Sequence, residues 1–261
     1  MTMNSNIIAV ANQKGGVGKT TTVVNLATAM AACNKSVLII DSDPQGNAST
    51  GLGYKKEIND KDFYKVITDQ DSINDSIIKT KIPNLSIIPT SVNLTVIEQE
   101  FVNIKDREEK LKQSIEKIKV NFDYILIDCP PSLGLLTINA LTAAKNLIVP
   151  LQVEFYALEG LTQLLQTVEL IKMNFNNSLN LQGIVLTMYD KRNKISEMVA
   201  QDVKNHFKEK VYKTIIPRNV KISEAPSHGV PILMYDITCA GSQAYAALAA
   251  ELINQEIKNS E

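Results

Sequence analysis

The sequence predicts an α/β fold with a doubly wound, mostly parallel sheet and helices on both faces. Short apolar runs recur along the chain and alternate with segments whose apolar residues repeat at helical spacing. The composition agrees, because 44% of the residues are hydrophobic and only 5% are aromatic, which gives the aliphatic core of a sheet covered on both sides. With no low-complexity linker or internal repeat, residues 1–261 are expected to form a single domain.

The first half of the chain begins with a strand, a loop and a helix. Residues 7–11 form an apolar run bounded by polar residues, which predicts a buried strand, and a glycine-rich loop follows. Apolar residues at helical spacing over residues 23–31 predict the first helix. A second apolar run over residues 36–40 predicts another strand, which is followed by aspartates.

The remainder of the chain continues this alternation. Further strands are predicted over residues 85–88, 122–128, 146–149 and 183–186, and helices over residues 158–171, 195–207 and 244–257. An amphipathic helix carried by Ile104, Leu111, Ile115 and Ile118 is expected before the strand at residues 122–128. Repeated strand and helix units of this kind form parallel sheets.

The glycine-rich loop has the parts of a phosphate-binding loop, although the pattern G-x-x-x-x-G-K-[ST] is not met letter for letter. Gly15, Gly16 and Gly18 free the backbone to turn its N–H groups toward an anion, and Lys19 can reach the β- and γ-phosphates. The Thr20 hydroxyl is placed to bind Mg²⁺. The expected nucleotide-binding residues of this loop are Lys14, Gly15, Gly16, Val17, Gly18, Lys19, Thr20 and Thr21. A ligand-free glycine turn would leave the two flanking lysines unexplained.

The run from Lys14 to Thr21, KGGVGKTT, resembles the deviant Walker A box of the ParA/MinD superfamily of P-loop ATPases. The resemblance implies ATP and Mg²⁺ as cofactors. It also implies that Lys14 crosses a dimer interface to the nucleotide of the partner subunit. A cation supplied in this way acts on developing phosphate charge as an arginine finger does, and it couples hydrolysis to dimerisation.

Aspartates follow two of the predicted strands, at the edge of a parallel sheet where ligands bind. By the same resemblance, Asp43 positions the attacking water and is catalytic together with Lys14 and Lys19, while Asp41 lies near Lys19 and the magnesium ion. The alternative is that these aspartates only form a turn before a proline. Asp128 ends a run that resembles a Walker B box, and it is expected to hold Mg²⁺ through a bound water, alongside Thr20.

Residues 187–192 and 215–229 resemble the ParA/Soj branch of chromosome-partitioning ATPases. The resemblance implies that Arg192 and Lys221 contact DNA without sequence preference, although an arginine is expected where this chain has Lys221. It also implies that Pro217 and Asn219 line the adenine pocket. Alternatively, the prolines of this stretch only bracket a rigid surface loop.

The charges of the chain are unevenly distributed along the sequence. The chain carries a net charge of −1, but residues 190–225 hold nine Lys and Arg against five Asp and Glu, a local charge of +4. A basic face on an acidic protein is typical of phosphate-backbone contact. Charge alone favours an ordinary solvated helix surface, and the resemblance shifts the balance toward DNA binding.

The function expected from these features is an ATPase whose ATP-bound homodimer binds DNA nonspecifically and acts with a ParB/Spo0J-type centromere-binding protein. The alternative is a MinD-like membrane-associated positioning ATPase. It is disfavoured because residues 249–261 hold three glutamates, one lysine and no aromatic residue, unlike a basic amphipathic membrane anchor. The start of the chain lacks a signal peptide or a preceding helix-turn-helix, so a cytoplasmic, nucleoid-associated protein is expected.

Cysteines that bind an iron–sulfur cluster would indicate a third class of protein, a cluster-bearing reductase or metal-assembly ATPase. Cys33, Cys129 and Cys239 are far apart and odd in number, which is atypical of a disulfide framework. Cys129 next to Asp128 is expected to be a small buried thiol rather than a cluster ligand.

Overall fold

In the computed structural model, which describes residues 5–54 and 61–260, seven strands form one sheet in the order β3-β4-β2-β5-β1-β6-β7. Every neighbouring pair is parallel except β3 with β4. The strands are β1 (Asn6–Val10), β2 (Val37–Asp41), β3 (Ile78–Lys79), β4 (Leu85–Ile88), β5 (Tyr124–Asp128), β6 (Asn146–Gln152) and β7 (Asn180–Thr187). The predicted mostly parallel sheet is therefore confirmed.

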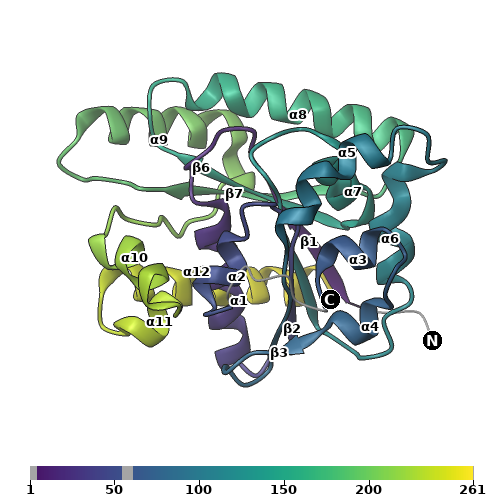
Figure 1. Ribbon diagram of the computed structural model, residues 1–261. Coiled ribbons are helices and arrows are strands. Elements are labelled where there is room, and N and C mark those ends of the chain that lie inside the picture. Colours follow the sequence, from purple (N-terminus) through teal and green to yellow (C-terminus); the bar gives the residue numbers. More distant parts are fainter. Residues whose placement is uncertain (1–4, 55–60, 261) are drawn as a thin grey trace.

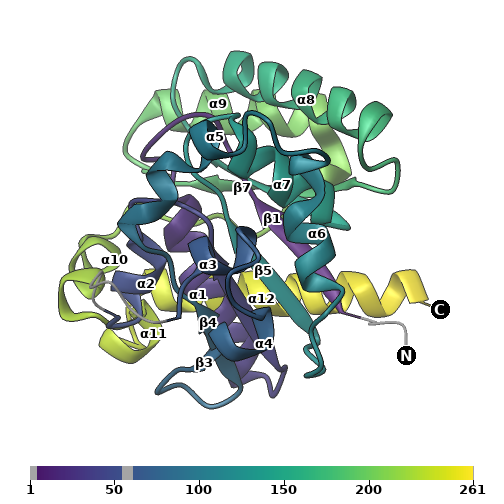
Figure 2. The ribbon, with the colours of Figure 1, turned by 45° about the vertical axis from the view of Figure 1, so that its right-hand side comes forward.

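Helices cover the sheet on both faces, as Figures 1 and 2 show. The α-helices are α1 (Lys19–Ala32), α2 (Asn47–Gly51), α3 (Phe63–Ile67), α4 (Ile73–Ser76), α5 (Ile97–Glu100), α6 (Lys110–Ile115), α7 (Leu135–Ala143), α8 (Ala157–Asn174), α9 (Lys194–Phe207), α10 (Val220–Glu224), α11 (Ile232–Tyr235) and α12 (Ala240–Ser260). Short 3₁₀ turns are η1 (Val92–Val96), η2 (Arg107–Glu109), η3 (Lys208–Lys210) and η4 (Ala225–His228).

The alternation of side chains along each strand divides the core into two layers. In β1, Ile8 and Val10 pack into the cluster beneath α1 and α12, whereas Ala9 packs into the cluster beneath α6, α7, α8 and α9. Neighbouring side chains on a strand point to opposite faces, so a run that is apolar at every position requires cover on both sides. All five residues of β2 and of β5 are buried for this reason.

The predicted strands were confirmed, over residues 85–88 with the predicted bounds and elsewhere with ends shifted by up to three residues, whereas one predicted helix was wrong in extent. Only α6, Lys110–Ile115, forms where a helix was expected to include Ile104. Ile104 lies in an irregular segment before that helix and is 42% exposed, and Ile118 lies beyond the end of the helix. The sequence pattern also missed α7, because eight of its nine residues are buried and it therefore lacks a polar face.

The C-terminal helix α12 packs along α1 on one face of the sheet (Figure 2). Its side chains Tyr245, Leu248 and Leu252 are buried there. These side chains of α12 are thus part of the core. None of the helices in the described part of the chain is both long and apolar enough to cross a membrane.

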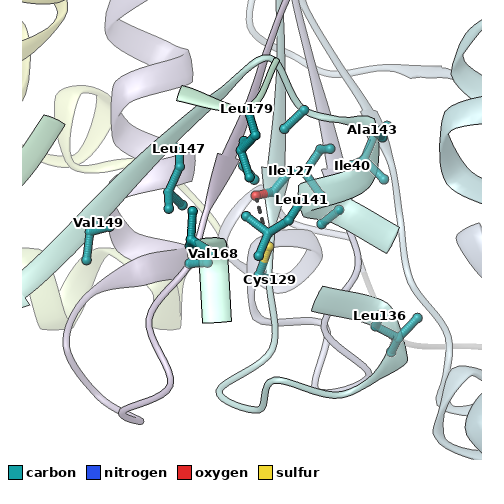
Figure 3. Close-up of a cluster of buried hydrophobic side chains, with 14 of the residues drawn as sticks. Ile40, Ile127, Cys129, Leu136, Leu141, Ala143, Leu147, Val149, Val168 and Leu179 are labelled. Atoms are coloured by element: carbon teal, nitrogen blue, oxygen red, sulfur yellow. Dashed lines mark hydrogen bonds between the residues drawn. The ribbon is translucent and has the colours of Figure 1, made fainter. Parts of the chain in front are cut away.

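Cys129 is the small buried thiol that was predicted. Figure 3 shows it among Ile127, Leu141 and other apolar side chains of the core. Its Sγ donates to the backbone oxygen of Ile127 at 3.9 Å, and burial raises the pKa of the thiol. Cys33 is exposed at the end of α1, and Cys239 lies half-buried before α12.

The order of the strands brings three functional segments to one edge of the sheet. Strand β5 lies between β1 and β2, so Asp128 pairs in register with Asp41 on one side and with Val10 on the other. The loop after Val10 and the two aspartates therefore meet at the carboxyl ends of the strands. This is the position at which open α/β sheets bind ligands.

Candidate nucleotide-binding and hydrolysis site

The loop between β1 and α1 has the backbone of an anion-binding loop. Gly16 and Gly18 adopt φ values of +75° and +93°, which side chains other than glycine rarely tolerate. Helix α1 begins at Lys19 directly after Gly18, and no side chain caps its first N–H groups. These donors and the positive end of the helix dipole face the mouth of the loop, which suits a phosphate.

Lys19 points back into this loop rather than out to solvent. The residue is only 6% exposed, and its Nζ donates to the backbone oxygen of Lys14 at 3.1 Å. Burial lowers the pKa of this amine, while the negative charges of Asp128 and Asp43 raise it. Bringing a phosphate to this ammonium would compensate for the lost solvation.

Two fully buried carboxylates lie side by side on β2 and β5. Asp41 Oδ2 accepts hydrogen bonds from the backbone N and the Oγ of Ser49, at 2.8 and 2.6 Å. Burial raises the pKa of Asp41 to about 6, and the charge of Asp43 adds to the shift against the hydrogen bonds from Ser49. Burial also raises the pKa of Asp128 well above its usual value, reinforced by the charge of Asp41 and opposed by Thr20 and Lys19.

The donor atoms left unpaired here fit a magnesium ion. Both carboxylate oxygens of Asp128 and the Oδ1 of Asp41 are buried without a hydrogen-bond partner among the described residues. An orphaned carboxylate next to the Thr20 hydroxyl is the donor set that Mg²⁺ uses together with phosphate oxygens and waters. Across the described residues, no group of three or more His, Cys, Asp or Glu forms a metal cage. Phosphates and waters would therefore complete the coordination shell.

The raised pKa of Asp41 predicts a pH-dependent stability of the nucleotide-free protein. A carboxylate whose folded pKa exceeds its unfolded value contributes stability below pH 4, and this contribution is lost as the pH rises through about 6. Asp41→Asn cannot ionise and its Oδ1 can still accept from Ser49. The variant is therefore expected to gain about 1–3 kcal/mol over the wild type between pH 4.5 and pH 7.

Urea denaturation of both proteins without nucleotide at these two pH values measures the effect. Repeating it with Mg²⁺ and ATP provides the control, because a bound cation should remove the advantage of the variant. An equal difference in stability at both pH values would contradict the buried charge as its cause.

Asp43 lies in the loop after β2, on the wall of the nucleotide cleft. It is 6% exposed, and its Oδ1 accepts a hydrogen bond from the backbone N of Gln45 at 2.9 Å. This hydrogen bond uses one carboxylate oxygen and fixes the orientation of the group. The residue also lines the cleft, where a carboxylate could orient a water.

The cleft extends from the phosphate loop toward the segment before α10. Its main part has a volume of about 390 Å³, lined by the loop glycines, Lys19, Thr20, Asp43 and Pro226 among others. A second part of about 230 Å³ is lined by Pro217 and Asn219 and shares Gly18, Thr21 and Pro226 with the first. Both predicted adenine-pocket residues therefore lie on a cavity that adjoins the phosphate site. Asn219 also accepts a hydrogen bond from the backbone N of Lys221 and so caps α10.

Lys14 differs from the rest of the loop because its side chain leaves the cleft. Its Nζ forms an ion pair with Glu154, and its side chain is 50% exposed. Among the described residues, Lys14 lines a separate surface hollow with Gln13, Pro131 and Tyr156, and the lining of the nucleotide cleft does not include it. Glu154 was not predicted as a site residue, because it lies 140 residues away in the sequence and belongs to no motif.

The two cations expected to contact DNA are Arg192, in the loop before α9, and Lys221, in the first turn of α10, and both lie beside the nucleotide cleft. A parallel bridge joins Tyr189 to Pro217, and this places the loop before α9 next to the start of α10. The Arg192 side chain is 89% exposed and that of Lys221 is 47% exposed. Arg218, which no motif predicted as a DNA contact, lies near enough to Asp190 to lower the pKa of that carboxyl. It therefore belongs to the same surface.

Comparison with known proteins agrees with this geometry. A family model described as an AAA domain matches residues 5–181. The chain is 53% identical to the chromosome partitioning protein ParA of Caulobacter vibrioides over 96% of this chain and 94% of that protein. It is 51% identical to the sporulation initiation inhibitor protein Soj of Bacillus subtilis over 94% and 97%.

A solved structure extends this comparison to a bound nucleotide. Cobyrinic acid a,c-diamide synthase of Mycobacterium smegmatis, with an ATP analog and magnesium bound, superimposes with a TM-score of 0.86 at 32% identity. The match covers 98% of this chain and 97% of that one.

Proposed function

Because the chain belongs to the ParA/Soj family of chromosome-partitioning ATPases, we propose that it is a switch that dimerises on ATP and is reset by hydrolysis of ATP to ADP. Its cofactors are ATP and Mg²⁺, in agreement with the nucleotide and magnesium bound by its structural relative. As the ATP-bound dimer it binds double-stranded DNA without sequence preference. In this way it segregates chromosome or plasmid DNA.

Each part of the cleft has a distinct role in this proposal. The loop N–H groups and Lys19 bind the phosphates, and Pro217 and Asn219 bind the adenine. Mg²⁺, held by Thr20 and through water by Asp128, would neutralise phosphate charge. Asp43 orients the attacking water, and positioning of this kind supplies most of the catalysis in phosphoryl transfer.

The direction of Lys14 is the observation that carries the dimerisation step. In the single chain this lysine lies outside its own nucleotide cleft and on an exposed surface, paired with Glu154. A second subunit facing this surface would bring its triphosphate to Lys14. Contacts made only in the closed ATP-bound dimer favour that state, so hydrolysis of the γ-phosphate would release it.

The DNA-binding step rests on the basic surface around Arg192, Arg218 and Lys221. One copy offers few cations, whereas a dimer presents two such surfaces to the same duplex. Binding through phosphates is independent of sequence and sensitive to salt. A ParB/Spo0J-type centromere-binding protein would be the partner that stimulates hydrolysis, and binding to bulk DNA would place the protein on the nucleoid in the cytoplasm.

The test of this function is DNA binding measured with ATP, with ADP and without nucleotide, over a range of salt concentrations. Tight binding only in the ATP state, together with an affinity that falls steeply with salt, is expected. Light scattering on the same samples should report a dimer only with ATP. Equal DNA binding in all three states would reject the switch, and binding to liposomes in the absence of DNA would favour the MinD-like alternative.

A further inference from the structure

Each of the two cations proposed to contact DNA is already paired with a carboxylate of the same chain. Arg192 donates from Nε and Nη2 to the two oxygens of Asp190, at 3.0 and 2.9 Å. The Nζ of Lys221 lies 3.5 Å from Glu224 Oε2. A fork of two hydrogen bonds is the geometry with which a guanidinium binds phosphate. Asp190 thus occupies the Nε–Nη2 edge of Arg192, one of the edges through which a guanidinium binds phosphate with two hydrogen bonds.

The two pairs lie on one surface rather than on separate parts of the molecule. The backbone N of Arg218 donates to the oxygen of Tyr189 at 2.9 Å, so the segment that leads into α10, which carries the second pair, lies against the loop that carries the first. Both Arg192 and Arg218 lower the pKa of Asp190, to about 2. This carboxylate is therefore ionised at every pH at which the protein would meet DNA.

Neither carboxylate depends on its cation alone. Asp190 Oδ1 also accepts from the backbone N of Arg192 at 3.0 Å, and Glu224 Oε2 accepts from the hydroxyl of Tyr235 at 3.2 Å. The ring of Tyr235 also lies 5.4 Å from Lys221 Nζ. Each acid therefore keeps a hydrogen bond when its cation leaves, and this lowers the cost of the exchange.

We propose that Asp190 and Glu224 compete with the DNA backbone for Arg192 and Lys221 and thereby set the affinity of the chain for polyanions. This inference rests on the DNA binding proposed above. A phosphate that binds through the same donors must displace the carboxylate from them, so one subunit binds more weakly than it would without these acids. A dimer offers both pairs twice to one duplex, and the second contact is then made at high effective concentration.

The test is the affinity of the ATP-loaded protein for a duplex of random sequence after replacement of the competing acids. Asp190→Asn and Glu224→Gln are each expected to tighten binding by about threefold to tenfold, and the gain should shrink at high salt. Glu209→Gln is the matched control, because it removes one negative charge from the same basic segment. Glu209 lies in η3, at the far end of α9 from Arg192, about 20 Å along the helix.

A double-mutant cycle separates competition for Arg192 from a general charge effect. In an Arg192→Ala background, Asp190→Asn should tighten binding no more than the Glu209→Gln control does. Equal gains for Asp190→Asn with and without Arg192, or a gain no larger than that of the control, would overturn the inference. If neither the wild type nor the acid variants bind DNA with ATP, the proposed function fails as well, so the two failures are distinguishable. Thermal melting with Mg²⁺ and ATP verifies that each variant is folded.

Discussion

Replacement of Asp43 by Ala is expected to reduce the turnover of ATP at least about 100-fold while ATP binding and dimerisation persist. Asp43 lies on the wall of the cleft and is oriented by Gln45, but the loop N–H groups and Lys19 that would bind the phosphates do not depend on it. Removing a negative charge near the triphosphate should leave the affinity for ATP unchanged or slightly higher. The variant should therefore remain in the ATP-bound dimer and bind DNA persistently.

Single-turnover hydrolysis and nucleotide binding, measured on the same sample, separate the two effects. Asp43→Asn is the matched variant, because it keeps the size of the side chain and its contact with Gln45 but loses the charge. A loss of ATP affinity equal to the loss of turnover would show that Asp43 acts in binding rather than in orienting water. Near-normal turnover in Asp43→Ala would remove it from the mechanism.

Replacement of Lys14 by Ala is expected to abolish ATP-dependent dimerisation and to reduce hydrolysis by about 10³-fold, the range found for cations supplied by a second subunit. The backbone of Lys14 would still accept from Lys19, because that hydrogen bond uses its carbonyl oxygen at 3.1 Å. ATP should therefore still bind to the single chain. This combination of bound nucleotide, no dimer and no turnover distinguishes Lys14 from Lys19.

Lys172→Ala is the matched control for the loss of Lys14. It likewise removes a lysine from a surface Lys–Glu ion pair, with Glu169 at 3.1 Å, but on α8 away from the phosphate loop. The control should dimerise and hydrolyse ATP normally, since exposed pairs of this kind add little to stability. Analytical ultracentrifugation with ATP measures the dimer. Normal dimerisation and turnover in Lys14→Ala would refute the role of Lys14 across the interface.

Some features of the fold could be predicted from the sequence, and others could not. Glycine spacing and apolar runs act locally on the backbone. For this reason β1, the phosphate loop after it and the aspartates that end β2 and β5 could be predicted. The extent of α6 and the existence of α7 could not. A helix that is buried on all sides has no amphipathic pattern, and Ile104 has the spacing of a helix but is 42% exposed in the folded chain.

The candidate site divides in the same way. The roles of Lys14, Lys19, Thr20 and Asp128 were predicted from their motifs. Their environments were not: the ion pair of Lys14 with Glu154 joins residues far apart in the chain. Likewise, the buried contact between Asp41 and Asp128 requires β2 and β5 to be neighbours in register. Arg192 and Lys221 could be predicted as DNA-contacting cations, but their ion pairs with Asp190 and Glu224 could not.

By itself, the sequence determined the class of fold, the phosphate loop and the chemical groups available to a nucleotide. These follow from periodicity, glycine content and local spacing, which act over a few residues. Only the tertiary structure decided which charges meet, which carboxylates lose their water and which lysine faces outward. Burial and pairing of charges depend on the order and register of the strands, because these bring distant residues within interaction range and exclude solvent around them.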